Sequence, residues 1–128
     1  MADLQTLIDR QEITDLVSRL GLWIDEKRFD QTDDLFTDDI SVRTLGGEAQ
    51  GVERVAAQAA RNHTTDTQHV ITNVLVDLDG DRATAGANLV VTFNEPRRTL
   101  GERYRFEAVR EPVGWRLSAI AVEAVWRR

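Results

Sequence analysis

Cysteine is absent from this chain of 128 residues, and lysine occurs only once, at Lys27. Without cysteine, disulfides and cysteine-ligated zinc or iron–sulfur sites are excluded, and we expect a cytoplasmic setting. No stretch approaches the ~20 consecutive apolar residues of a membrane-spanning helix, so we expect no membrane partner. Residues 1–4 contain neither a basic nor an apolar segment, so we also expect no secretory signal.

Positive charge is in short supply as well. The 16 Lys and Arg residues stand against 22 Asp and Glu, which gives a formal net charge of -6. An acidic chain without a basic cluster lacks the phosphate-neutralising surface of nucleic-acid binders, so we expect no nucleic-acid partner. Hydrophobic residues make up 41% of the chain, which excludes a disordered protein and suits one domain over residues 1–128. Arginine in place of lysine, with abundant alanine, valine and aspartate, is typical of high-GC bacteria.

The N-terminal half has the pattern of helices. Apolar residues recur at spacings of three to five between residues 4 and 26, which predicts one long helix. At ~1.5 Å per residue this helix is roughly 35 Å long, so it must lie across a broad surface such as a curved sheet. We further predict a short helix at 30–36, capped by Asp30, a short strand at 40–43 and a third helix at 51–62.

From residue 68 the hydrophobic period changes to two, which is typical of strands. Strands joined by tight turns form an antiparallel meander, and four are predicted here: 68–78, 82–94, 101–110 and 115–126. Helices first and strands second indicate the α+β class. We therefore expect a strongly curved antiparallel sheet wrapped around the long helix, with two shorter helices, as a cone with an open mouth.

Both faces of the last predicted strand are apolar. One face carries Trp115, Leu117, Ala119 and Ala121, and the other carries Ile120, Val122 and Ala124. Only one face can cover the long helix, and an exposed apolar patch of this size marks an interface. The sequence therefore predicts a homodimer joined through the outer face of the sheet, with Ile120 and Val122 in or near the contact.

Asp25 and His69 are the strongest candidates for chemistry. Imidazole exchanges protons near neutral pH, and His69 is one of only two histidines. Asp25 lies at the end of the long predicted helix, where a carboxylate opposes the helix dipole, so its position calls for a reason. If the helix ends in the mouth of the cone, Asp25 can accept a hydrogen bond from one His69 nitrogen and leave the other as a base. The alternative is that the pair only braces the helix against the sheet.

Further candidates surround this pair. Asn73 follows His69 by four residues on the same predicted strand face, so it can orient a substrate carbonyl or hydroxyl, or serve as a buried amide. Aromatic residues can line an apolar cavity or belong to the core; we expect Trp23 and Trp126 near the mouth and include Tyr104 as a substrate contact. His63 and Asp66 lie in a polar loop, so we expect no metal site.

Several stretches, in order, carry a family resemblance that covers nearly the whole chain. They are LIDRQEI at 7–13, WIDEKRFD at 23–30, LFTDD at 35–39, TQH at 67–69 followed by Asn73, DGDRA at 79–83, GWRL at 114–117 and VW at 125–126. Together they resemble the SnoaL-like domain of the nuclear-transport-factor-2-like superfamily, which includes scytalone dehydratase and polyketide cyclases.

The resemblance implies a cystatin-like α+β barrel and a small enzyme that needs no cofactor and no metal. Asp25 and His69 match the positions of the Asp–His pair of the family's dehydratases, which implies a catalytic dyad. The family's second pocket histidine has no counterpart after His69, and Tyr104 is the only tyrosine. The implied substrate is a hydrophobic carbonyl compound, such as a polyketide, aromatic or terpenoid-like molecule, and the implied reaction is dehydration, isomerisation or cyclisation. The alternative is a non-catalytic ligand-binding or protein-interaction module.

Overall fold

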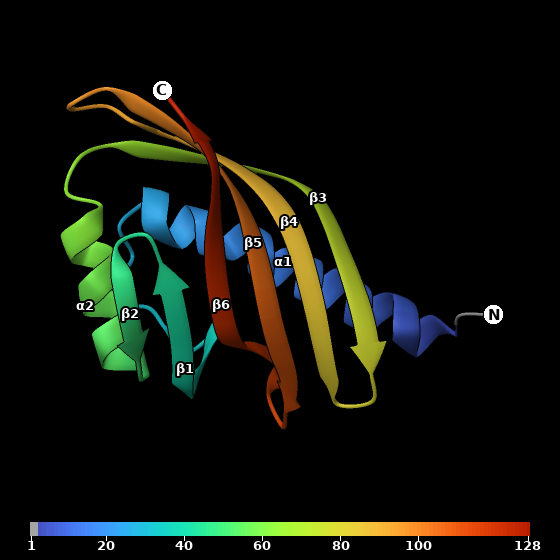
Figure 1. Ribbon diagram of the computed structural model, residues 1–128. Helices are drawn as coiled ribbons and strands as arrows, with labels where there is room; N and C mark the ends of the chain where they lie inside the picture. The colour runs from blue at the N-terminus through green and yellow to red at the C-terminus, as the bar shows by residue number, and fades with distance from the viewer. Residues whose placement is uncertain (1–2) are drawn as a thin grey trace.

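The computed structural model describes residues 3–128, so Met1 and Ala2, at the start of the segment that we expect to carry no signal, lie outside it. Its elements are α1 (Leu4–Asp25), β1 (Phe36–Thr44), β2 (Gly47–Gln50), α2 (Val52–Asn62), β3 (Thr67–Asp79), β4 (Arg82–Phe93), β5 (Arg98–Glu111) and β6 (Gly114–Arg127). The strands form one sheet in the order β2-β1-β6-β5-β4-β3, which curves around α1 (Figure 1). All neighbouring strands are antiparallel except β1 and β6. The α+β cone is therefore confirmed.

Helix α1 begins at Asp3, whose carboxylate accepts a hydrogen bond from the backbone N–H of Thr6 at 2.8 Å. Its buried face packs against β3 and β6. Near its C-terminal end, a Cβ on Gly21 would meet the Ile71 side chain at 3.0 Å. The missing Cβ thus lets the end of α1 approach β3 closely, and this approach brings Asp25 to the start of that strand.

The core lies between α1 and the concave face of the sheet. In β4 every second residue is buried, as the period of two predicted: Ala83, Ala85, Ala87, Leu89, Val91 and Phe93. In β5 the expected face of Tyr104, Phe106 and Ala108 is buried as well. Within the described part of the chain, no helix is long and apolar enough to cross a membrane.

A polar cluster ties the N-terminal half of α1 to the sheet. Asp9 is only 5% exposed, and its carboxylate accepts two hydrogen bonds from Arg110, at 2.9 and 2.7 Å, and one from the Trp115 indole at 3.1 Å. The hydrogen bonds from Arg110 hold the pKa of Asp9 well below its usual range. The carboxylate is therefore ionised and fully engaged in the folded protein.

The predicted helix at 30–36 was wrong. This segment contains isolated turns, in which the backbone N–H of Gln31 bonds to the Arg28 carbonyl and that of Leu35 to the Thr32 carbonyl. The Leu35 carbonyl accepts a hydrogen bond from the backbone N–H of Leu117 in β6 at 2.8 Å. The chain therefore already pairs with the sheet within the range predicted to be helical. The short strand β2 was not predicted, because Gly46 and Gly47 indicated only the end of β1.

Three irregularities in the sheet decide which face each side chain occupies. In β3 the pairing shifts between Thr72 and Leu75, where Asn73 has a left-handed backbone with φ of 59°. In β6, Ser118 and Val125 have no partner in β5, because the register shifts beside each of them. Each extra residue turns all later side chains of its strand to the opposite face.

Candidate active site

A cavity of about 610 Å³ lies at one end of the core. Its walls come from the end of α1, from α2 and from the inner faces of β4, β5 and β6. Their apolar part includes Leu20, Trp23, Leu89, Val91, Leu100 and Val122. The volume falls in the range of small-molecule sites. The α2–β3 loop, the β4–β5 hairpin and the C-terminus gather at this end of the molecule (Figure 1).

Asp25 and His69 are in contact, as predicted, and His69 lines this cavity. The Nδ1 atom of His69 lies 2.6 Å from Asp25 Oδ1, and the His69 backbone N–H donates to Asp25 Oδ2 at 2.8 Å. The Thr67 hydroxyl also donates to Asp25 Oδ1, at 2.9 Å. Three hydrogen bonds therefore fix the Asp25 carboxylate, and their donors all come from the first three residues of β3.

This geometry determines the state of the imidazole. A carboxylate can only accept, so Nδ1 of His69 carries the proton and Nε2 carries a lone pair. The His69 side chain is 3% exposed, and this burial lowers its pKa even though the hydrogen bond to Asp25 acts in the opposite direction. At neutral pH the ring is therefore neutral, as a general base must be.

A second imidazole, that of His63, shares the cavity, which was not predicted from the sequence. The ring of His63 lies 5.5 Å from that of His69 and stacks on Phe93 at 5.8 Å, measured between ring centroids. Its Nδ1 donates to the Ala59 carbonyl at 2.8 Å, so its Nε2 is also an acceptor, and burial lowers its pKa. The available signal was that both histidines of the chain lie within seven residues of each other.

Lys27 fastens the loop that carries His63. Its backbone is left-handed, with φ of 56°, and its Nζ donates to the carbonyls of His63 and Thr65 at 2.9 and 2.8 Å. The lone lysine thus ties the end of α1 to the α2–β3 loop, and its charge further favours neutral imidazoles at both histidines.

Tyr104 and Glu102 project from β5 toward the same cavity. Tyr104 is 4% exposed, and burial together with the nearby Glu102 raises the pKa of its phenol far above the usual value. The hydroxyl is therefore a permanent hydrogen-bond donor. Burial also raises the pKa of Glu102. Tyr104 was predicted to contact substrate, whereas Glu102 was not singled out.

Trp23 lines the cavity as predicted, but it is also part of the core. It is 3% exposed and packs edge-on against Phe29 and Phe36 at centroid distances of 5.0 and 5.1 Å. Its indole Nε1 is buried and has no hydrogen-bond partner within residues 3–128. The Trp23 ring is thus a tightly packed part of the cavity wall.

Two predicted substrate contacts lie elsewhere. Asn73 borders the opposite face of the sheet, because the bulge at this residue reverses the alternation that would have placed it beside His69. Trp126 is 45% exposed and lies over Gly101, where a Cβ would come within 2.2 Å of the indole. The bulge at Val125 directs Trp126 outward and turns Arg127 to the cavity.

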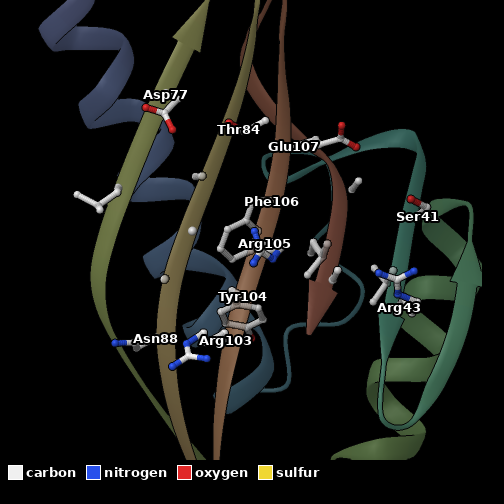
Figure 2. Close-up of a pocket in the computed structure, with 18 of the residues that line it drawn as sticks. Ser41, Arg43, Asp77, Thr84, Asn88, Arg103, Tyr104, Arg105, Phe106 and Glu107 are labelled. Atoms are coloured by element: carbon white, nitrogen blue, oxygen red, sulfur yellow. The ribbon is translucent and has the colours of Figure 1, made fainter. Parts of the chain in front are cut away.

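The face of the sheet turned away from α1 holds a second hollow, of about 1200 Å³ (Figure 2). Ile120 and Val122, which we predicted in or near a contact on this outer face, point mainly inward instead. Ile120 is 6% exposed in the core, and Val122 lines the inner cavity, because the bulge at Ser118 shifts the alternation. Ala119 and Ala121 face outward in their place.

The described residues contain no cluster of three or more His, Asp or Glu side chains that could hold a metal ion. Among the groups at the site, two imidazole nitrogens can accept a hydrogen bond and the Tyr104 hydroxyl can donate one. Such an arrangement can remove a proton from a ligand and stabilise the negative charge that results.

Comparison with known proteins identifies the family. The SnoaL-like domain family matches residues 5–121, so the chain belongs to this family. An uncharacterized protein of Mycobacterium tuberculosis is 32% identical over 91% of this chain and 86% of its own length.

Solved structures agree with this assignment. Kfla4162 of Kribbella flavida is 28% identical, with a TM-score of 0.85 over 98% of this chain and 95% of that one. A hexachlorocyclohexane dehydrochlorinase (LinA type 2) is 20% identical, with a TM-score of 0.89 over 99% of this chain and 92% of that one, which shows a common fold.

Proposed function

We propose that this protein is a cofactor-independent lyase or isomerase that removes a proton from a hydrophobic small molecule. The substrate carries a carbonyl or another group that can accept negative charge, as in a polyketide, aromatic or terpenoid-like compound. The observation that carries the proposal is the Asp25–His69 contact of 2.6 Å at Nδ1, which leaves Nε2 of His69 to act on a ligand in the cavity that His69 lines.

His69 acts as the general base through Nε2. Asp25 holds the Nδ1–H tautomer and stabilises the imidazolium that forms when the proton is taken. Because the ring is neutral before the reaction, no proton has to be removed from it first. Dehydration, isomerisation and cyclisation all begin with this step, and they differ in where the electron pair then moves.

Tyr104 contacts the substrate oxygen, a role for which Asn73 was one candidate in the sequence. Its hydroxyl remains protonated throughout the neutral range, so it can donate a hydrogen bond to an oxyanion that develops on the substrate. One pre-oriented donor of this kind accounts for about 10²–10³-fold in rate. The dehydrochlorinase with the same fold supports an elimination in particular, since its name denotes the removal of hydrogen chloride.

The test uses nitrobenzisoxazole, a probe of proton abstraction that requires no knowledge of the natural substrate. A base removes its ring C–H proton, the N–O bond breaks, and a coloured cyanonitrophenolate is released. We expect saturable turnover by the wild type and a loss of about 10²–10⁴-fold in His69→Gln. Arg54→Gln, on the exposed face of α2, is the matched control. Equal rates for wild type and His69→Gln would refute the proposal and favour a non-catalytic binding module.

We also propose that the protein is a homodimer joined through the hollow of Figure 2. Asp77, Thr84 and Glu107 are aligned across β3, β4 and β5, and the neighbouring row contains Arg105. Consider a two-fold axis that lies in this face, runs perpendicular to the strands and passes between the row of Glu107 and the row of Arg105. Such an axis would place Glu107 of one copy against Arg105 of the other. The face is thus complementary to itself in charge, as an isologous interface requires.

The oligomeric state tests this arrangement. We expect a dimer at micromolar concentration in sedimentation velocity, dissociation in Arg105→Glu, and recovery of the dimer in Arg105→Glu combined with Glu107→Arg. A wild-type monomer, or a dimer that Arg105→Glu leaves intact, would refute it.

A further inference from the structure

Three arginines stand at the cavity, each contributed by a different element. Arg61 lies at the end of α2, Arg98 at the start of β5 and Arg127 at the end of β6. These segments meet at one end of the molecule (Figure 1). The other charged residues that line the cavity are Glu95 and Glu102. In a chain with a net charge of -6, the cavity has thus gathered more cationic than anionic side chains.

None of these three arginines forms a salt bridge within the part of the chain that the structure describes. No Asp or Glu oxygen of residues 3–128 lies within 4.0 Å of the guanidinium of Arg61, Arg98 or Arg127. Arg110, by contrast, binds two carboxylates. The guanidinium of Arg98 lies 4.2 Å above the Phe93 ring, which orients it at the cavity wall.

Arg98 and Arg127 are close neighbours on the inner face of the sheet. Arg127 pairs with Leu100 across β5 and β6, and Arg98 precedes Leu100 by two residues, so both arginines share its face. The bulge at Val125 produces this placement, since without it Trp126 would face inward. Diagonal cross-strand neighbours have Cα atoms roughly 7–8 Å apart, a spacing at which long side chains can reach one bound group.

A row of aromatic rings lies between Arg98 and His69, the proposed base. Arg98 covers Phe93, Phe93 stacks on His63, and His63 adjoins His69. Two aromatic side chains therefore separate the arginine from the proposed base. A ligand that reaches both must present an anionic end to Arg98 and extend an apolar body along these rings.

We propose that Arg98 and Arg127 form an anion subsite, and that the substrate is an apolar carboxylic acid whose carboxylate they hold. Guanidinium groups bind carboxylate oxygens through charge-assisted hydrogen bonds, and the diagonal placement of the two residues lets both side chains reach one carboxylate. The proposal rests on the proposed function in one respect, namely that this cavity is the substrate site. It adds the class of the substrate and the direction in which it binds.

The experiment compares two probes of the same shape. Naphthoate and naphthamide share an apolar body and differ in charge, and their affinities are measured by titration calorimetry at low salt. We expect the wild type to bind naphthoate at least tenfold more tightly than naphthamide. In the double variant Arg98→Gln, Arg127→Gln this preference falls below about twofold, while the affinity for naphthamide is unchanged. Arg54→Gln, the control, keeps the preference.

Equal affinity of the wild type for both probes would overturn the subsite, as would failure to bind either of them or a preference that survives the double variant. The outcome is independent of catalysis, because these probes are not turned over. A preference that depends on the two arginines, with equal nitrobenzisoxazole rates for wild type and His69→Gln, would retain the subsite and refute the proposed function.

Discussion

Replacing Asp25 by Asn separates a catalytic dyad from a structural brace. The carboxylate accepts hydrogen bonds from the Thr67 hydroxyl, the His69 backbone N–H and His69 Nδ1. An Asn side chain has only one acceptor oxygen, and an NH₂ donor takes the place of the other carboxylate oxygen. This NH₂ either faces another donor, so that one hydrogen bond is lost, or forces His69 into the tautomer with the proton on Nε2. A hydrogen bond to a charged group contributes about 1.5–3 kcal/mol. If that amount is lost in the transition state, the rate falls by about 10- to 150-fold.

The pH dependence provides a sharper criterion. Burial lowers the pKa of His69, and Asp25 opposes this by raising it. Activity requires neutral His69, so it is lost as pH falls through this pKa, in a limb that lies below the ordinary value of 6.5. In Asp25→Asn the opposing contribution disappears while burial remains. The limb should therefore move to lower pH while the plateau rate decreases.

The assay is the nitrobenzisoxazole rate between pH 4 and 9, with the His69 ring proton followed by NMR over the same range. His63→Gln removes the neighbouring ring and assigns the NMR signal. A limb that stays in place or moves to higher pH in Asp25→Asn would show that Asp25 does not set the protonation of His69, and the dyad would then be a brace between α1 and β3.

Three further outcomes are expected. Asp9→Asn should lower the free energy of unfolding in urea by about 1.5–3 kcal/mol at pH 7, because Arg110 loses its buried charged partner. Folding depresses the pKa of Asp9, so the stability difference between wild type and variant should shrink as pH falls below about 4, the pKa of the unfolded state. Tyr104→Phe should lower the nitrobenzisoxazole rate by about 10²–10³-fold with little change in KM, and an unchanged rate would exclude the hydroxyl as the oxyanion donor. Trp126→Ala should leave the naphthoate affinity within about twofold of the wild type, and a larger loss would mean that this side chain reaches the cavity.

Local sequence was sufficient for the class of fold and for the dyad. The apolar spacing of residues 4–26 and the period-two strands depend on the neighbours of each residue along the chain, and helix α1 and strands β3 to β6 lie where these patterns put them. Asp25 and His69 were found because a carboxylate at a helix end and a rare histidine at a strand start are conspicuous in any sequence. The family resemblance pointed to the same two positions.

The faces of the strands were decided by tertiary structure. The bulges at Asn73, Ser118 and Val125 are where a curved sheet inserts one extra residue, and each reverses every later side chain of its strand. This removed Asn73 from the cavity, brought Val122 into it and exchanged Trp126 for Arg127.

The pairing of His63 with His69 likewise arose only in the fold. The two rings meet because Lys27, at the end of α1, holds the α2–β3 loop against the start of the sheet. Periodicity thus determined that a helix is wrapped by a sheet, and residue type and position along the chain pointed to the contact between Asp25 and His69. Curvature and register, which depend on contacts between residues distant in the chain, determined which other side chains line the cavity.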